Sequence, residues 1–257
     1  MTTPTWDRAA ALPAVAGERR PAVAALASDL PSAAALFEFM RDAELRFRTL
    51  RLRIEERTFT ARGEALATVD TAIRHPGRAR VLTGEPGRGT AGSYEVWLSD
   101  GATVRTWSGI HGLATGRPVR PRPRGLDRSF PGTARVYEPL TALPAETLPD
   151  LFVHPAGYCQ NVLATGDCRI VGTDSVAGRE AVVLTCAHPR AIERAADRPD
   201  FRIELAVDRA TGIIARLIET IGGDVTREAV ATALQPDVEL APGTFELTLP
   251  EGANRIF

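Results

Sequence analysis

The residues whose types could support chemistry gather in one stretch of the chain, between His154 and His188. All three cysteines lie there, at Cys159, Cys168 and Cys186, together with two of the four histidines. Thiolate sulfur and imidazole nitrogen are ligands of tetrahedral zinc sites. A thiol beside an imidazole is also a nucleophile with its base. This one stretch therefore raises two hypotheses, a metal site and a thiol enzyme.

The spacing of these residues supports neither hypothesis well. A zinc shell would recruit Cys159, Cys168, Cys186 and His188, but their spacing is irregular and includes no C-x-x-C pair. Catalysis would also need a group that orients the base and a donor for the oxyanion, and neither is identifiable. We therefore expect three small, partly buried thiols, with no metal, no cofactor and no catalytic residue.

Two of the cysteines flank an expected β-hairpin. Its strands are predicted over 169–173 and 179–185, with the turn at 175–178. Cys168 and Cys186 are each nine residues from Ala177, so a symmetric hairpin would place them opposite each other on one face. That arrangement is compatible with a disulfide, which would require an oxidising compartment.

Composition excludes several classes of enzyme. The chain has 257 residues, a net charge of −1 and 31 basic residues, all of them arginine. Without lysine it has no Walker-type phosphate loop, no kinase site and no Schiff base. It also contains no G-x-S-x-G or H-E-x-x-H motif. A net charge near zero provides no general attraction to nucleic acid, so we expect no nucleic-acid partner.

Hydrophobic periodicity predicts that strands dominate the chain. At 50–59, Leu50, Leu52 and Ile54 alternate with charged residues. Further strands separated by Gly-containing turns are expected over 65–73, 78–83, 94–98, 103–107, 201–208, 213–221, 225–234 and 245–249. One helix is expected to begin near Ser32, and a second, short helix is expected over 139–150. The last four strands form an antiparallel meander.

Three short motifs resemble the LolA-like lipoprotein-carrier superfamily. They are the V-D-x-x-T-G turn at 207–212, the terminal F-x-L-x-L-P-x-G-A at 245–253, and the S-D-G hairpin at 99–101. The resemblance implies a mainly β (α+β) fold, a curved antiparallel open half-barrel whose concave face holds an acyl chain. It also implies that the helix from Ser32 covers the open mouth and that 139–150 acts as a lid. RseB-like stress sensors share this fold.

An apolar ligand on the concave face would occupy a cavity between the sheet and the Ser32 helix. Such a broad sheet exposes more apolar area than the two expected helices can cover, so a groove should remain. The candidate ligand-binding residues come from the apolar faces of the strands: Leu52, Ile54, Val96, Leu98, Val104, Ile203, Leu205, Val207, Phe245 and Leu247. Packing in the core is the competing explanation for each of them.

Two segments are expected to lie outside the main body of the domain. Residues 1–31 are rich in Ala and Pro and are predicted to be a poorly ordered arm before a single domain over 32–257. An Arg/Pro-rich insertion is expected at 109–132. Its stretch 116–128 is either a solvated loop or a contact for a partner protein.

No run of the sequence approaches the roughly 20 apolar residues of a membrane-spanning helix, so we do not expect an integral membrane protein. The N-terminus has no recognisable signal peptide. The sequence as written therefore predicts a cytoplasmic protein, or an exported one if the start site is misassigned.

Three functions remain open at this point. The first is a non-enzymatic binding protein that holds a lipid or acyl chain in a half-barrel cavity. The second is a regulatory sensor that docks a partner protein. The third is a metal- or thiol-dependent site at the cysteines and histidines.

Overall fold

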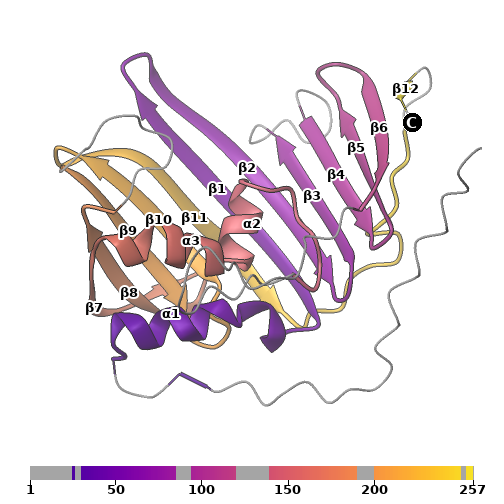
Figure 1. Cartoon of the computed structure of the whole chain (residues 1–257). Helices are drawn as coiled ribbons and strands as arrows, with labels where there is room; N and C mark the ends of the chain where they lie inside the picture. The colour runs from indigo at the N-terminus through magenta and orange to yellow at the C-terminus, as the bar shows by residue number, and fades with distance from the viewer. Residues whose placement is uncertain are drawn as a thin grey trace, which may run out of the picture.

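The protein is built on one broad, open sheet (Figure 1). The computed structural model describes residues 25–26, 30–84, 94–119, 139–189, 200–249 and 253–256. Within them, strands pair in the order β12-β6-β5-β4-β3-β2-β1-β11-β10-β9-β8-β7. All neighbouring pairs are antiparallel except β12 with β6. The predicted mainly β, open antiparallel sheet is confirmed.

The strands agree closely with the period-two segments of the sequence. Their bounds are β1 (Thr49–Thr60), β2 (Gly63–Arg74), β3 (Arg78–Gly84), β4 (Tyr94–Asp100), β5 (Thr103–Ser108), β6 (Leu113–Pro118), β7 (Asp167–Val176), β8 (Arg179–Ala187), β9 (Phe201–Asp208), β10 (Ile214–Ile221), β11 (Asp224–Pro236) and β12 (Asn254–Ile256). The helical elements are α1 (Ala33–Arg41), η1 (Ala43–Arg46), α2 (Leu148–Val153), α3 (Ala156–Asn161) and η2 (Leu163–Thr165), where η marks a 3₁₀ turn.

Alternation along each strand separates a helix-covered face from an outer face. Leu50, Leu52 and Ile54 of β1 are fully buried, whereas Arg51 and Arg53 between them are exposed. Successive side chains of a strand point to opposite faces, so one side of β1 is apolar and the other is in water. The α-helices lie on the apolar side (Figure 1), and the main core fills the space between them and the sheet.

The longest helix begins where the sequence predicted. Ser32 is its N-cap, and the Ser32 side chain accepts a hydrogen bond from the Ala35 N–H at 3.2 Å. Leu36, Phe39 and Met40 of α1 are buried in the main core. The chain then tightens into the 3₁₀ turn η1, whose Ala43 and Glu44 are buried.

The turn between β9 and β10 is built by a buried carboxylate. Asp208 accepts hydrogen bonds from the Thr211 N–H at 2.8 Å and the Thr211 hydroxyl at 2.6 Å. Arg179 of β8 binds the same carboxylate through Nε at 2.6 Å and through a second guanidinium nitrogen at 3.0 Å. The V-D-x-x-T-G motif is therefore a structural turn, and it docks against α1 through Gly212.

Two expected elements differ in the structure. Residues 245–249 are not a strand, because the turn at 242–245 sends the chain across the outer face instead of along a sheet edge. There Leu247, Leu249 and Ala253 pack on a second cluster formed by Val96, Trp107 and Ala114. The short helix is also later than predicted and begins at Leu148, since Glu146 has a φ of 62°, which a right-handed helix does not allow.

The stretch expected to be an insertion contains a strand. Residues 113–118 form β6, which pairs with β5 and β12. The signal was weak because Leu113 is the only large apolar residue within 113–118. Residues 120–138, most of 1–31 and 190–199 lie outside the described residues, and so does most of the proposed partner contact at 116–128.

Candidate functional site

A cavity of ≈490 Å³ lies on the helix-covered face of the sheet. Its walls come from strands β1 to β5 and β11, and its roof from residues 144–149, a turn followed by the first two residues of α2. The lining residues are Glu56, Val69, Val81, Thr83, Glu95, Val96, Trp97, Thr106, Trp107, Ser108, Pro144, Glu146, Thr147, Leu148, Pro149 and Arg227. The cavity therefore lies beneath residues 144–149, which we call the roof segment.

This position differs from the one predicted. We expected the cavity between the sheet and the Ser32 helix, but Leu36 and Met40 of α1 are fully buried against the main core. The space remains open further along the sheet, over β2 to β5, where the turn before α2 and the first residues of that helix form the cover.

The floor of the cavity is apolar. Val69 of β2 and Val81 of β3 are buried. Their partners on the neighbouring strands lie on the same face of the sheet. Trp97 lies directly opposite Val81 in the register and packs partly against the main core. Leu148 and Pro149, both buried, complete the apolar part from above. These side chains can hold the apolar portion of a small ligand.

One end of the cavity carries an ion-pair cluster. Arg227 of β11 binds Glu56 of β1, with Nε and Oε1 2.7 Å apart, and a second guanidinium nitrogen lies 3.6 Å from Oε1 of Glu219 on β10. Burial alone would lower the pKa of Arg227, but the two carboxylates outweigh this effect and raise that pKa. Arg227 is thus a fixed cation with its carboxylate partners already in place.

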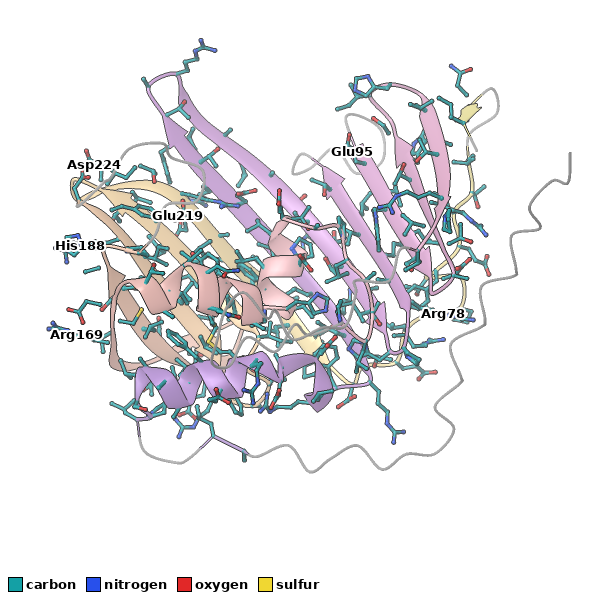
Figure 2. The ribbon with its side chains drawn as sticks, viewed as in Figure 1. Arg78, Glu95, Arg169, His188, Glu219 and Asp224 are labelled. Carbon is teal, nitrogen blue, oxygen red and sulfur yellow. The ribbon has the colours of Figure 1, made fainter. Side chains whose placement is uncertain are left out.

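The rim of the cavity carries two further carboxylates. Glu95 of β4 is exposed and lies between Thr83 and Ser108 in the strand register. The Ser108 hydroxyl donates to Oε1 of Glu95 at 3.4 Å. Glu146 of the roof segment is exposed as well. Figure 2 shows Glu95 and Glu219 over different halves of the sheet, so the rim and the ion-pair cluster mark two ends of the site.

The ten ligand-binding candidates named from the sequence do not converge on this cavity. Only Val96 borders it, although the Val96 side chain packs in the second cluster on the outer face. Leu52, Ile54, Ile203, Leu205 and Val207 are close-packed in the main core. Because Trp97 faces the helices, its neighbours Val96 and Leu98 face the outer side. Phe245 and Leu247 lie on the C-terminal segment, where Arg74 stacks over the Phe245 ring, and Val104 is buried at the far end of β5.

The residues that sequence reasoning missed are polar ones on apolar strand faces. In β1 the buried series Leu50, Leu52 and Ile54 continues with Glu56 on the same face. The alternation along β1 assigns Glu56 to the interior, although Glu56 is charged. This mismatch is the signal that could have located the site. The contribution of the roof segment could not be read in this way, because it has no periodicity.

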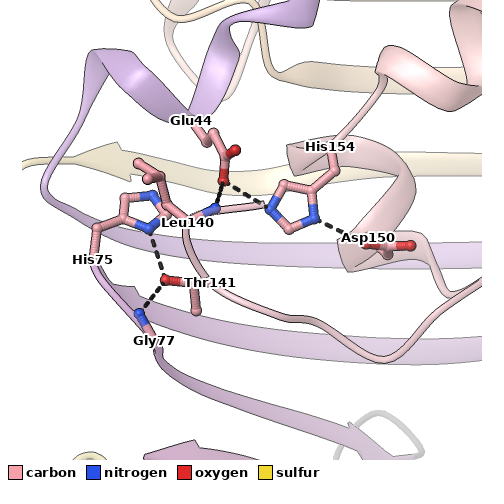
Figure 3. Close-up of polar contacts among 7 residues, drawn as sticks. All are labelled: Glu44, His75, Gly77, Leu140, Thr141, Asp150 and His154. Atoms are coloured by element: carbon pink, nitrogen blue, oxygen red, sulfur yellow. Dashed lines mark hydrogen bonds and ion pairs between the residues drawn. The ribbon is translucent and has the colours of Figure 1, made fainter. Parts of the chain in front are cut away.

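The roof segment is anchored by a buried histidine (Figure 3). His154, just after α2, places Nδ1 2.8 Å from Oδ1 of Asp150 and Nε2 3.3 Å from Oε2 of Glu44. Burial lowers the pKa of His154, yet its hydrogen bonds to the two carboxylates dominate and raise that pKa to about 9. At neutral pH His154 is therefore an imidazolium that bridges α2 to η1.

The other side of the roof segment is held by the neighbouring contacts in Figure 3. The Leu140 N–H donates to Oε2 of Glu44 at 2.8 Å. The Thr141 hydroxyl accepts from the Gly77 N–H at 2.8 Å and lies 2.8 Å from Nδ1 of His75. The chain is thus fixed to the β2–β3 turn before the roof and to η1 after it, which makes the roof a fixed wall of the cavity.

The cysteines form a separate, structural group. Cys168 and Cys186 are partners in the β7–β8 register, as predicted. The hairpin is not symmetric, however: its turn is the two-residue Ala177-Gly178, and a bulge at Val171 restores the alignment. Both sulfurs point to the Leu163 carbonyl oxygen, at 3.1 and 3.5 Å. All three cysteines are free thiols.

Two of the three thiols are poorly suited to nucleophilic chemistry. Burial raises the pKa of Cys159 to about 12. A hydrogen bond with Cys186, together with burial, raises the pKa of Cys168. His188 is exposed at the margin of the sheet (Figure 2), whereas Cys159 and Cys186 are buried. Across the part of the chain that the structure describes, no three His, Cys, Asp or Glu side chains are grouped so as to hold a metal ion.

In the described ranges, no helix has the length and apolar character needed to cross a membrane. No protein-family model and no curated protein matches the chain.

Several solved structures are similar to the chain. For MucB in the Pseudomonas aeruginosa MucA/MucB complex, identity is 19%, coverage is 84% of this chain and 61% of the MucB chain, and the TM-score is 0.49. LprF from Mycobacterium bovis is 14% identical; the match covers 88% of this chain and 100% of the LprF chain, and the TM-score is 0.40. The LolA superfamily protein NE2245 from Nitrosomonas europaea is 10% identical; the match covers 84% of this chain and 98% of the NE2245 chain, and the TM-score is 0.32. The chain therefore spans about three fifths of the MucB chain that it matches.

Proposed function

We propose that this protein is a non-catalytic binding protein that holds the apolar part of a small ligand in the cavity beneath the roof segment. The observation that carries the proposal is the cavity itself. Its volume of ≈490 Å³ lies within the roughly 300–1,000 Å³ of small-molecule sites. Its lining combines an apolar floor with a few polar groups, which is the usual composition of such sites.

The architecture explains why this space stays open. α2 and α3, with six residues each, and α1, with nine, cover a sheet far wider than themselves. Their buried side chains serve the main core over β1–β3 and β7–β11. Among the residues that the structure describes, the cavity over β2–β5 is covered by the roof segment, which His154 and Thr141 hold in place. A fixed wall keeps the cavity from collapsing, so a ligand meets a preformed site.

A pair of matched substitutions tests the proposal. Ser108 lines the cavity, whereas Ser175 is exposed next to the β7–β8 turn. Saturable binding of the neutral apolar fluorophore N-phenyl-1-naphthylamine is expected for the wild-type protein. Ser108→Trp should weaken that binding at least tenfold, because the indole fills the cavity, and Ser175→Trp should leave it unchanged. Absence of saturable binding, or equal binding by both variants, would refute the proposed function.

A further inference from the structure

The charges around the cavity are predominantly negative. Among the lining residues that the structure describes, Glu56, Glu95 and Glu146 are acidic and Arg227 is basic. Arg227 is already held by Glu56 at 2.7 Å and lies 3.6 Å from Glu219. The charge of its guanidinium is therefore largely balanced by these carboxylates. An anionic ligand at Arg227 would also lie close to both of them and be repelled by them.

The two carboxylates at the rim differ from the two carboxylates that lie beside Arg227. Glu95 and Glu146 are both exposed, and neither has an ion pair among the described residues. The Ser108 hydroxyl at 3.4 Å provides the only hydrogen bond to the Glu95 side chain in the part of the chain described. Both groups therefore keep acceptor capacity for a ligand at the point where the cavity opens to solvent.

The remaining lining groups also favour a cation. Trp97 is two residues from Glu95 on the same face of β4, and the face of an indole ring attracts cations through its quadrupole. The Thr106 hydroxyl is already engaged in a hydrogen bond with the Thr115 hydroxyl at 2.6 Å. The cavity thus presents an apolar floor, an aromatic side chain and carboxylates at the opening.

We infer that the ligand is a cationic amphiphile. Its apolar chain lies between the sheet and the roof segment, and its amine or quaternary ammonium group sits at the rim with Glu95, Glu146 and Trp97. This inference rests on the proposed function and adds the chemical class of the ligand. Charge complementarity distinguishes it from a fatty acid, whose carboxylate would face two carboxylates of the same sign.

Three compounds with the same ten-carbon chain and different head groups distinguish the effect of head-group charge on binding from the effect of burying the chain. Decyltrimethylammonium, decanol and decanoate are each titrated against the protein loaded with N-phenyl-1-naphthylamine. Decyltrimethylammonium should displace the fluorophore at a concentration about tenfold or more below that of decanoate, with decanol between them. Added salt should narrow the difference, because the rim carboxylates are exposed and screened.

The double variant Glu95→Gln, Glu146→Gln identifies the residues responsible. It should lose the preference for the cation while binding decanol as the wild-type protein does. Glu239→Gln, an exposed change on the C-terminal segment, is the matched control and should retain the preference. Because these substitutions are isosteric and at exposed positions, the fold should tolerate them.

The outcomes separate the inference from the proposed function. If decanol and decanoate displace the fluorophore as well as the cation does, the cavity binds apolar chains and the inference about charge is wrong. A preference that survives in the double variant also overturns it. If the fluorophore itself does not bind, the proposed function fails first. Displacement by an arginine-rich peptide but not by decyltrimethylammonium would assign the rim to a basic protein segment and contradict the inference.

Discussion

At the scale of single residues, the polar contact of His154 gives a prediction about pH. Its two ring nitrogens face two carboxylates, those of Asp150 and Glu44, on different helical elements. A neutral imidazole has one N–H and can donate to only one of them. The contact therefore requires the protonated ring, and it links the conformation of the roof segment to the charge state of one histidine.

The pH dependence of this contact can be predicted with its sign. The pKa of His154 is raised from 6.5 to about 9, so folding favours the protonated form. The resulting stabilisation is complete below about pH 6.5, decreases as the pH rises, and is lost above about pH 9. Its full size is about 3 kcal/mol.

Urea unfolding of wild-type protein and His154→Gln at pH 6, 7.5 and 9.5 measures the effect. The difference in the free energy of unfolding should be largest at pH 6 and smallest at pH 9.5. The exposed residue His188 gives the control, since His188→Gln should change stability by less than about 0.5 kcal/mol at each pH. A difference for His154→Gln that does not vary with pH would show that the ring contributes by packing alone.

At the scale of elements, the β9–β10 turn shows that a sequence motif shared with a protein family can have a structural role. Asp208 holds the turn, and Gly212 at its end has a φ of +80°. A Cβ added at Gly212 would lie 3.1 Å from the Phe39 carbonyl oxygen and 3.2 Å from Cα of Met40. The glycine thus permits both the turn and the close approach of α1 to the sheet.

Two Gly→Ala substitutions separate these two effects. Gly178 in the β7–β8 turn has a φ of +73° but no atom within 4 Å of an added Cβ. Gly178→Ala should therefore cost only the backbone strain, about 1 kcal/mol. Gly212→Ala should cost more, about 2–4 kcal/mol, because α1 must also move. Chemical denaturation gives both values. Equal losses for the two variants would mean that α1 adjusts without cost and that the contact is not tight.

At the scale of the whole molecule, one strand pair joins the two ends of the chain. β1 and β11 pair from Leu50 with Pro236 to Thr58 with Arg227, and the main core extends across this junction. Strands β2–β6 lie on one side of the junction and β7–β10 on the other. Neither side can bury the apolar face of β1 or β11 alone, so the sheet should unfold as one unit.

A charge placed in the junction tests this cooperativity. Ala231 is buried opposite Ile54, whereas Ala233 pairs with Arg53 on the outer face. Ala231→Asp should destabilise the protein by more than about 3 kcal/mol, because it buries an unpaired carboxylate. Ala233→Asp should have little effect. Tryptophan fluorescence, which follows Trp97 and Trp107, and far-UV circular dichroism should give coincident transitions. Two separated transitions would indicate independent halves.

The sequence also allowed several local features to be predicted. The alternation of Leu50, Leu52 and Ile54 with arginines predicted β1 and its buried face, and Ser32 predicted the start of α1. The alignment of Cys168 with Cys186 was predicted as well, although the bulge that produces it was not. A bulge depends on how two strands twist against their neighbours, and this information is not contained in local spacing.

The sequence by itself determined the class of fold and which side of each strand is apolar, because both follow from the period of two along a strand and from the turns that interrupt it. Tertiary structure alone decided where space remains. Leu52 and Leu205 have the pattern of cavity residues, yet they are packed in the core. Glu56, Glu95, Trp97 and Arg227 line a cavity because residues 144–149, a turn and the start of α2, cover the sheet there. Whether an apolar face is covered or left open depends on which distant segment lies on it, and no local pattern carries that information.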